Sequence, residues 1–205
     1  ERSPALGEVG AGLTLSPNAT RALIGLGLGE TLERAADEPH TGLTRHWRDA
    51  RVLTRSERGA AIRAKYGAPY LQIHRADLLE MLAQASAREA AIEVHTAHAL
   101  VGIDTQGERS VLQFENGARV SADVVLGCDG LKSAVRNALF GETPAQFSGY
   151  VAWRALVPAS ALAVPLDPPA QLFIGIERMF MRYLVRHGAL VNVVAVARSP
   201  GWTDE

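Results

Sequence analysis

Cysteine, net charge and long apolar runs are all scarce in this sequence. Its 205 residues include one cysteine, Cys128, which excludes a disulfide scaffold and every metal or redox motif that needs several cysteines. With 21 Lys and Arg against 22 Asp and Glu, the net charge of −1 provides no basic field for nucleic acid or an anionic membrane. No apolar run reaches the ~18 residues of a transmembrane helix, and the start does not resemble a signal peptide. We therefore expect a soluble cytoplasmic protein with no membrane span, no metal site and no nucleic-acid partner.

The hydrophobic patterns predict an α/β portion up to about residue 147 and an antiparallel sheet beyond it. Apolar residues recur at helical spacing from Leu78 to Ala85, among good helix formers, and predict a helix over residues 75–90. After Gly149 the pattern changes to β-type runs separated by turn residues. These runs cover residues 150–157, 171–176, 179–185 and 189–197. The predicted fold class is therefore α/β, and α+β overall.

The region between this helix and residue 130 predicts further strands. Alternating runs occur at residues 100–103, 111–114 and 118–120. The last two flank Asn116-Gly117, a pair typical of hairpin turns. Residues 92–95 are also expected to form a strand, and the nearly continuous apolar run at 122–127 predicts a strand buried on both faces. Cys128 follows directly and is expected to be a small side chain in the core.

Two local features are candidate ligand sites, and each has a plainer alternative. Asp129-Gly130 lies between the predicted buried strand and a helix start at Ser133, where ligands of open α/β sheets bind, but Asp-Gly there is also a common turn. Arg75, at the start of the predicted helix, either binds a phosphate or ribose in a cleft or is solvated. The arginine-rich stretch 45–63 is interrupted by acidic residues and indicates a solvated hairpin rather than a nucleic-acid surface.

Four motifs, taken in their order, resemble one enzyme family. They are Gly7-Glu8-Val9-Gly10-Ala11-Gly12-Leu13 with Ser16-Pro17-Asn18, then His74-Arg75-Ala76-Asp77-Leu78, then Gly127-Cys128-Asp129-Gly130 with Ser133 and Arg136, then Gly149-Tyr150-Val151-Ala152-Trp153-Arg154. The sequence resembles the FAD-dependent aromatic hydroxylases, in the salicylate hydroxylase and 3-hydroxybenzoate 6-hydroxylase branch of the p-hydroxybenzoate hydroxylase class. The resemblance implies a partial Rossmann-like FAD-binding domain at residues 1–147 and a partial β-sheet substrate domain at 148–205.

The same resemblance implies site residues. Glu1 matches the acidic residue that binds the ribose hydroxyls of FAD, Leu100 flanks the adenine, and Asp129-Gly130 serves both FAD and the reduced pyridine nucleotide. The full set of implied cofactor residues is Glu1, Arg2, Val9, Gly10, Gly12, Arg75, Leu100, Asp129 and Gly130. Thr14, Arg182 and Tyr183 are the expected lining of the substrate pocket, and no side chain is assigned as catalytic.

The implied reaction is hydroxylation of a phenolic or hydroxybenzoate-like ring by O2, with NAD(P)H as the reductant of the flavin; a homodimer is compatible with the resemblance. The family begins with a strand and a Gly-x-Gly-x-x-Gly turn, and it carries a later Gly-Asp motif. The sequence contains neither, so we expect the chain to be incomplete at both ends. Two alternatives stay open: a non-catalytic remnant that binds no FAD, and a related flavin reductase or epoxidase.

Overall fold

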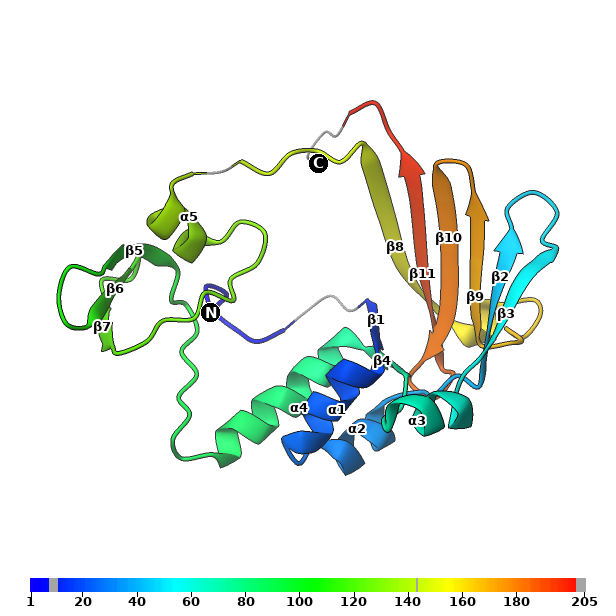
Figure 1. The fold of residues 1–205 in the computed structure, drawn as a ribbon, viewed down its shortest axis with the longest axis horizontal. Coiled ribbons are helices and arrows are strands. Elements are labelled where there is room, and N and C mark those ends of the chain that lie inside the picture. Colours follow the sequence, from blue (N-terminus) through cyan, green and yellow to red (C-terminus); the bar gives the residue numbers. More distant parts are fainter. Residues whose placement is uncertain (8–10, 143, 202–205) are drawn as a thin grey trace. The chain divides into compact units, whose positions relative to one another are not determined.

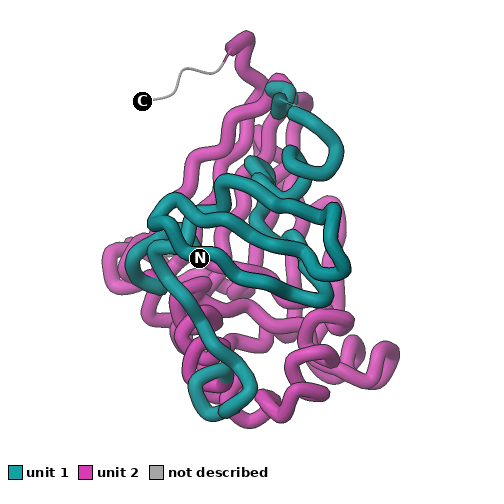
Figure 2. The backbone as a smooth tube through the Cα atoms, turned by 90° about the vertical axis from the view of Figure 1, so that its left-hand side faces the viewer, with its two compact units in different colours: residues 1–6, 86–148 teal, residues 7–85, 149–205 magenta. Residues whose placement is uncertain are grey.

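The chain forms two compact units, shown in different colours in Figure 2. The structure is a computed structural model and describes residues 1–7, 11–142 and 144–201. Unit 1 consists of Glu1–Leu6 and Ser86–Ser148, and unit 2 consists of Gly7–Ala85 and Gly149–Glu205. The fold is mixed α/β, with more sheet than helix. Each unit is therefore assembled from two separate stretches of the sequence.

The largest element of unit 2 is a six-stranded sheet with the strand order β3-β2-β9-β10-β11-β8 (Figure 1). Its strands are β2 (Thr41–His46), β3 (Val52–Glu57), β8 (Tyr150–Pro158), β9 (Ala170–Gly175), β10 (Arg178–Val185) and β11 (Leu190–Arg198). A short 3-10 helix, Ala159–Ala161, follows β8. The strand runs predicted after Gly149 are confirmed, and so is the hairpin predicted within the arginine-rich stretch. The sheet is larger than predicted, because this hairpin joins it through a parallel pairing of β2 with β9.

The helices of unit 2 pack with a short antiparallel strand pair, β1 with β4. These elements are β1 (Gly12–Leu15), α1 (Pro17–Gly25), α2 (Gly29–Ala35), α3 (Ala60–Tyr66), β4 (Leu71–His74) and α4 (Arg75–Arg88). Proline occupies the first turn of α1 after Ser16, a position where its fixed φ suits a helix. Leu15, Leu32 and Ile73 belong to one buried apolar cluster, which joins the strand pair to the helices. Burial of each such side chain stabilises the fold by about 1.5–3 kcal/mol.

The β10–β11 turn attaches the sheet to the helical part of unit 2. Arg186, His187 and Gly188 have φ values of 56°, 53° and 78°, a region that residues other than glycine rarely adopt. The Arg186 guanidinium donates two hydrogen bonds to the carboxylate of Asp77 in α4, at 3.0 and 2.6 Å. The His187 amide donates to a carboxylate oxygen of Asp37 at 3.0 Å. Two carboxylates therefore hold a turn whose backbone conformation is otherwise unfavourable.

Unit 1 contains a three-stranded antiparallel sheet and one short helix. The strands are β5 (Leu100–Asp104), β6 (Ser110–Phe114) and β7 (Arg119–Ala122), and the helix is α5 (Ala134–Phe140). Gly117, in the β6–β7 turn, has a φ of 84°, as the Asn-Gly signal requires. The three strands predicted in this region are confirmed.

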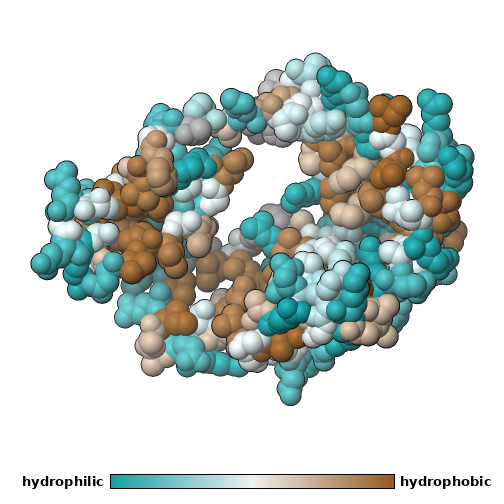
Figure 3. Space-filling model, in the orientation of Figure 1, coloured by the Kyte–Doolittle hydropathy of each residue, from teal (hydrophilic) through white to brown (hydrophobic). Residues whose placement is uncertain are grey.

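Two strands predicted in unit 1 are absent from the structure. Residues 92–95 pair with no strand in the described part of the chain, and of the predicted strand at 122–127 only Ala122 is paired, as the last residue of β7. An apolar run indicates a tendency to be buried, but a strand also needs a neighbour for its backbone, and the sequence does not identify that neighbour. Val124 and Leu126 are 74% and 82% exposed, and Figure 3 shows apolar side chains at the surface of the molecule.

Cys128 is exposed, so its prediction as a core residue is wrong for the same reason: it follows an unpaired segment. In the described ranges, no helix is both long and apolar enough to cross a membrane.

We predict that Asp77→Asn destabilises the chain by about 1 kcal/mol near neutral pH, because a half-exposed charge-assisted hydrogen bond is lost. The hydrogen bonds from Arg186 lower the pKa of Asp77 below its ordinary value. A carboxyl group with a lowered folded pKa contributes stability above its unfolded pKa, and this stability is lost as the pH falls through the folded pKa. The difference between wild type and variant should therefore shrink below about pH 4.

Urea denaturation at a series of pH values measures this difference. Glu57→Gln, which also replaces a carboxylate by an amide but at an exposed position of β3, is the control and should leave the stability nearly unchanged. A stability difference that is as large at pH 3 as at pH 7 would contradict the assignment.

Candidate functional site

In unit 1, the predicted adenosine-binding residues are brought together by backbone hydrogen bonds. The His98 amide donates to the Glu1 carbonyl at 2.8 Å, and the Ala97 amide donates to the Ser3 carbonyl at 2.9 Å. Glu1 is therefore bonded to His98, which precedes Leu100, the half-buried first residue of β5, by two residues. The Ser3 amide donates to Glu1 Oε1 at 2.8 Å and is the main cause of the lowered pKa of this exposed carboxyl. Arg2 is exposed beside it.

Asp129 organises the loop that leads into α5. Its Oδ1 accepts a hydrogen bond from the Ser133 hydroxyl at 2.5 Å, and its Oδ2 accepts one from the Val135 amide at 3.1 Å. Ser133 Oγ in turn accepts from the Arg136 amide at 3.0 Å and caps the helix. The Ser133 hydrogen bond is the main cause of the lowered pKa of Asp129. Both carboxylate oxygens are thus occupied within the loop.

Gly130 leaves its backbone open to a ligand. Its φ is 79°, and a Cβ added there would meet no atom within 4 Å. Any other residue at this position would be strained by its backbone conformation.

In unit 2, Gly12 and Tyr183 meet at the start of β1. A Cβ added to Gly12 would lie 2.7 Å from the Tyr183 ring and 2.8 Å from Asn192 Cβ, so only glycine permits this close approach. The Gly12 amide donates to Asn192 Oδ1 at 2.6 Å. Burial raises the pKa of Tyr183 to about 12, and a hydrogen bond with Thr14 partly opposes this shift. We call Gly12, Thr14, Tyr183 and Asn192 the Gly12 junction.

Arg75 is tied to the same segment through its backbone. As the first residue of α4, it donates its amide hydrogen to the Ala11 carbonyl at 2.9 Å. Its side chain is exposed and has further interactions. Gly12, Thr14, Arg75 and Tyr183 therefore lie close together, whereas Val9 and Gly10 fall outside the described residues.

Arg182 lies on the other face of the sheet. Successive side chains of a strand point to opposite faces, so Arg182 points away from the Gly12 junction while Tyr183 belongs to it. Arg182 Nη2 donates to Gln171 Oε1 at 3.0 Å, and its guanidinium lies 5.5 Å from the centre of the Phe173 ring. Burial and the nearby charge of Arg45 lower the pKa of Arg182. The structure thus separates Arg182 from the two other predicted pocket residues.

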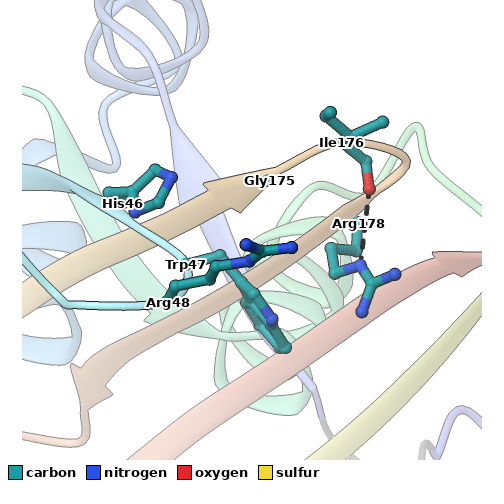
Figure 4. A pocket seen from close by; sticks show the side chains of 6 residues that line it. All are labelled: His46, Trp47, Arg48, Gly175, Ile176 and Arg178. Atoms are coloured by element: carbon teal, nitrogen blue, oxygen red, sulfur yellow. Dashed lines mark hydrogen bonds between the residues drawn. The ribbon is translucent and has the colours of Figure 1, made fainter.

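Two hollows lie near Trp47, away from the Gly12 junction. One, of about 380 Å³, is shown in Figure 4, where the Trp47 and Arg178 side chains lie by the β9–β10 turn. The second, of about 320 Å³, is lined by Trp47, Phe173, Phe180 and Arg182. Of the predicted site residues, Arg182 alone lines either hollow.

Asn192 is the residue of the junction that sequence reasoning missed. It is fully buried, and it is the one polar residue of β11 between Leu190 and Ala197. Asn is depleted in strands, so its position within this run was the available signal.

We predict that Ser133→Ala destabilises unit 1 by about 1 kcal/mol through loss of the helix cap. It should also raise the pKa of Asp129 toward its ordinary value, because the main cause of the lowered pKa is removed. Thermal unfolding and NMR titration of the Asp129 carboxyl measure the two effects. Ser148→Ala, at an exposed position of the same unit, is the control. An unchanged Asp129 titration would contradict the hydrogen bond.

We predict that Gly12→Ala destabilises unit 2 by about 1–3 kcal/mol, because the added methyl group overlaps Tyr183 and Asn192. Gly25→Ala is the matched control: a Cβ there meets no atom within 4 Å, and alanine is the better helix former. Urea midpoints of the two variants provide the comparison. If both shift equally, the close approach at Gly12 is not a constraint.

Comparison with known proteins identifies relatives across the chain. The family described as "FAD binding domain" matches residues 2–171. The chain is 39% identical to the 3-amino-4-hydroxybenzoate 2-monooxygenase PtnB3 of Streptomyces platensis, over 100% of the chain and 51% of that protein. It is 33% identical to the 3-hydroxybenzoate 6-hydroxylase of Klebsiella oxytoca, over 97% of the chain and 50% of that protein. The chain thus spans about half the length of these relatives.

A solved structure agrees with these relationships. The substrate complex of a salicylate hydroxylase superposes with a TM-score of 0.75 at 27% identity, over 95% of this chain and 51% of that one. The predicted resemblance and the predicted cofactor, FAD, are confirmed by these matches. The family match covers far more than half of the sequence, and the chain therefore belongs to the FAD binding domain family.

Proposed function

We propose that the whole protein is an FAD-dependent monooxygenase that hydroxylates a phenolic or hydroxybenzoate-like substrate with NAD(P)H and O2. The observation that carries the proposal is the family match over residues 2–171, together with relatives named for the hydroxylation of hydroxybenzoates. Because the chain spans about half of those relatives, the proposal concerns the whole protein rather than this stretch alone. We further propose that the protein is cytoplasmic and forms a homodimer.

The residues present fit FAD. Glu1 offers an exposed carboxylate for ribose hydroxyls, and Arg2 and Arg75 offer cations for phosphates. Gly130 offers an open backbone with positive φ. The remaining proposed contacts are Val9, Gly10, Gly12, Leu100 and Asp129, of which Asp129 acts by holding the loop in place. A bound flavin supplies the redox chemistry, accepting reducing equivalents from NAD(P)H and activating O2.

The chain's own residues position the reactants and exclude water. We assign residues 1–147 to a Rossmann-like cofactor domain and 148–205 to the substrate domain. Thr14, Arg182 and Tyr183 are the proposed pocket residues, and Thr14 and Tyr183 share the Gly12 junction. Arg182 lies on the opposite face of the sheet, where it lines the hollow beside Phe173 and Phe180.

Titration of the purified chain with FAD tests the cofactor assignment. We predict a yellow protein with near-stoichiometric flavin, and an affinity about tenfold weaker in Glu1→Gln, because the neutral amide binds ribose hydroxyls less strongly than the carboxylate. Glu89→Gln, at an exposed position of the same unit, should bind FAD as wild type does. A colourless chain that cannot be reconstituted would identify it as a non-catalytic piece.

Turnover by the whole protein tests the reaction class. NAD(P)H oxidation should be stimulated by salicylate, 3-hydroxybenzoate or 3-amino-4-hydroxybenzoate, and mass spectrometry should find one oxygen atom from isotope-labelled O2 in the ring product. Oxidation of NAD(P)H without ring hydroxylation would favour a reductase and overturn the proposal.

A further inference from the structure

Asn192 is an unusual residue for its position in β11. It is 0% exposed, and its neighbours Val191 and Val193 are typical of a sheet interior. Its Oδ1 accepts the Gly12 amide hydrogen at 2.6 Å, a contact that spans 180 residues of sequence. Its Nδ2 is buried and has no hydrogen-bond partner among the described residues. A buried donor without a partner is unfavourable, so packing alone favours an apolar side chain of similar volume here.

The peptide group between Ala11 and Gly12 is held from both sides. Its carbonyl oxygen accepts from the Arg75 amide at 2.9 Å, and its N–H donates to Asn192. Both polar atoms of one peptide plane are therefore engaged, one by the start of α4 and the other by the sheet. Two such bonds fix the rotation of the plane, which apolar contacts do not, because hydrogen bonds are directional.

Tyr183 restricts the same segment sterically. It is paired with Asn192 across β10 and β11, and it fills the space where a Gly12 side chain would lie. The backbone at Gly12 can neither approach the sheet more closely nor rotate without losing the Asn192 bond. Gly12 and Arg75, both proposed FAD contacts, are thereby held in one arrangement.

We propose that Asn192 is a positioning residue for FAD: it orients the Ala11–Gly12 peptide, and with it the backbone that receives the cofactor. This inference rests on the proposed function. Asn192 itself does not contact the flavin and acts through Gly12. The unsatisfied Nδ2 is then the cost of placing an acceptor at the position that Gly12 requires.

Asn192→Leu, whose side chain has the same branching and the same number of non-hydrogen atoms but no polar atom, separates positioning from packing. We expect a urea midpoint close to that of wild type, because the unpaired Nδ2 is removed while the Gly12 amide loses its acceptor, but an FAD dissociation constant raised about tenfold. With no FAD present, hydrogen exchange of the Gly12 amide should be at least tenfold faster in Asn192→Leu than in wild type. A residue with a merely structural role would lower the midpoint and leave the affinity of the folded chain unchanged.

Two further variants make the test decisive. Asn192→Asp keeps the acceptor oxygen and should retain Gly12 protection and FAD affinity within about threefold. Val194→Ala, on the same face of β11, should lower the urea midpoint without changing FAD affinity. If Asn192→Leu does not fold, Asn192→Asp and Val194→Ala are compared with wild type instead. Weaker FAD binding in Val194→Ala would overturn the proposal. Loss of the protection of the Gly12 amide from exchange in Asn192→Asp would overturn it as well.

The outcomes distinguish this inference from the proposed function. Wild-type FAD affinity and a protected Gly12 amide in Asn192→Leu would overturn the role of Asn192 while leaving FAD binding intact. If the wild-type chain binds no FAD, the proposed function and the cofactor role of Asn192 both fail for this chain. Hydrogen exchange of the Gly12 amide then shows separately whether its hydrogen bond to Asn192 exists.

Discussion

The turn end of the β10–β11 hairpin is the point on which the arrangement of unit 2 depends. Arg186 is bound there by Asp77, and the amide of His187 is bound by Asp37. A few residues along the same strands, Tyr183 and Asn192 contact the start of β1. Every one of these contacts joins segments far apart in the sequence, so together they tie the sheet to β1, to α4 and to the segment that follows α2.

This constraint links the sheet to the residues proposed to bind FAD. Asp77 lies two residues after Arg75, so the bond to Arg186 that fixes the first turn of α4 also fixes Arg75. Asn192 fixes Gly12 in the same way from the other side. The sheet therefore does more than provide a wall for the proposed substrate pocket: it fixes the backbone that we propose to bind the cofactor.

Local signals in the sequence predicted the elements that depend on local chemistry. The Asn-Gly turn and the apolar period of α4 both specify a structure within their own segment. Residues 92–95 and 122–127 were predicted wrongly, because strand formation depends on a pairing partner that no local pattern names. The parallel addition of β2 to β9 was missed for the same reason, since the two strands are far apart in the sequence.

The predicted site residues illustrate a second limit, because one residue type can serve different physical requirements. Alternation along β10 alone separates Arg182 from Tyr183, so their assignment to different faces was available from the sequence. The roles of the glycines were not. The Cβ direction of Gly12 is filled by the sheet, so glycine is required there for packing, and a cofactor that contacts Gly12 must approach its backbone from another side. At Gly130 the space in the Cβ direction is empty, and glycine is required there because the backbone has a φ of 79°.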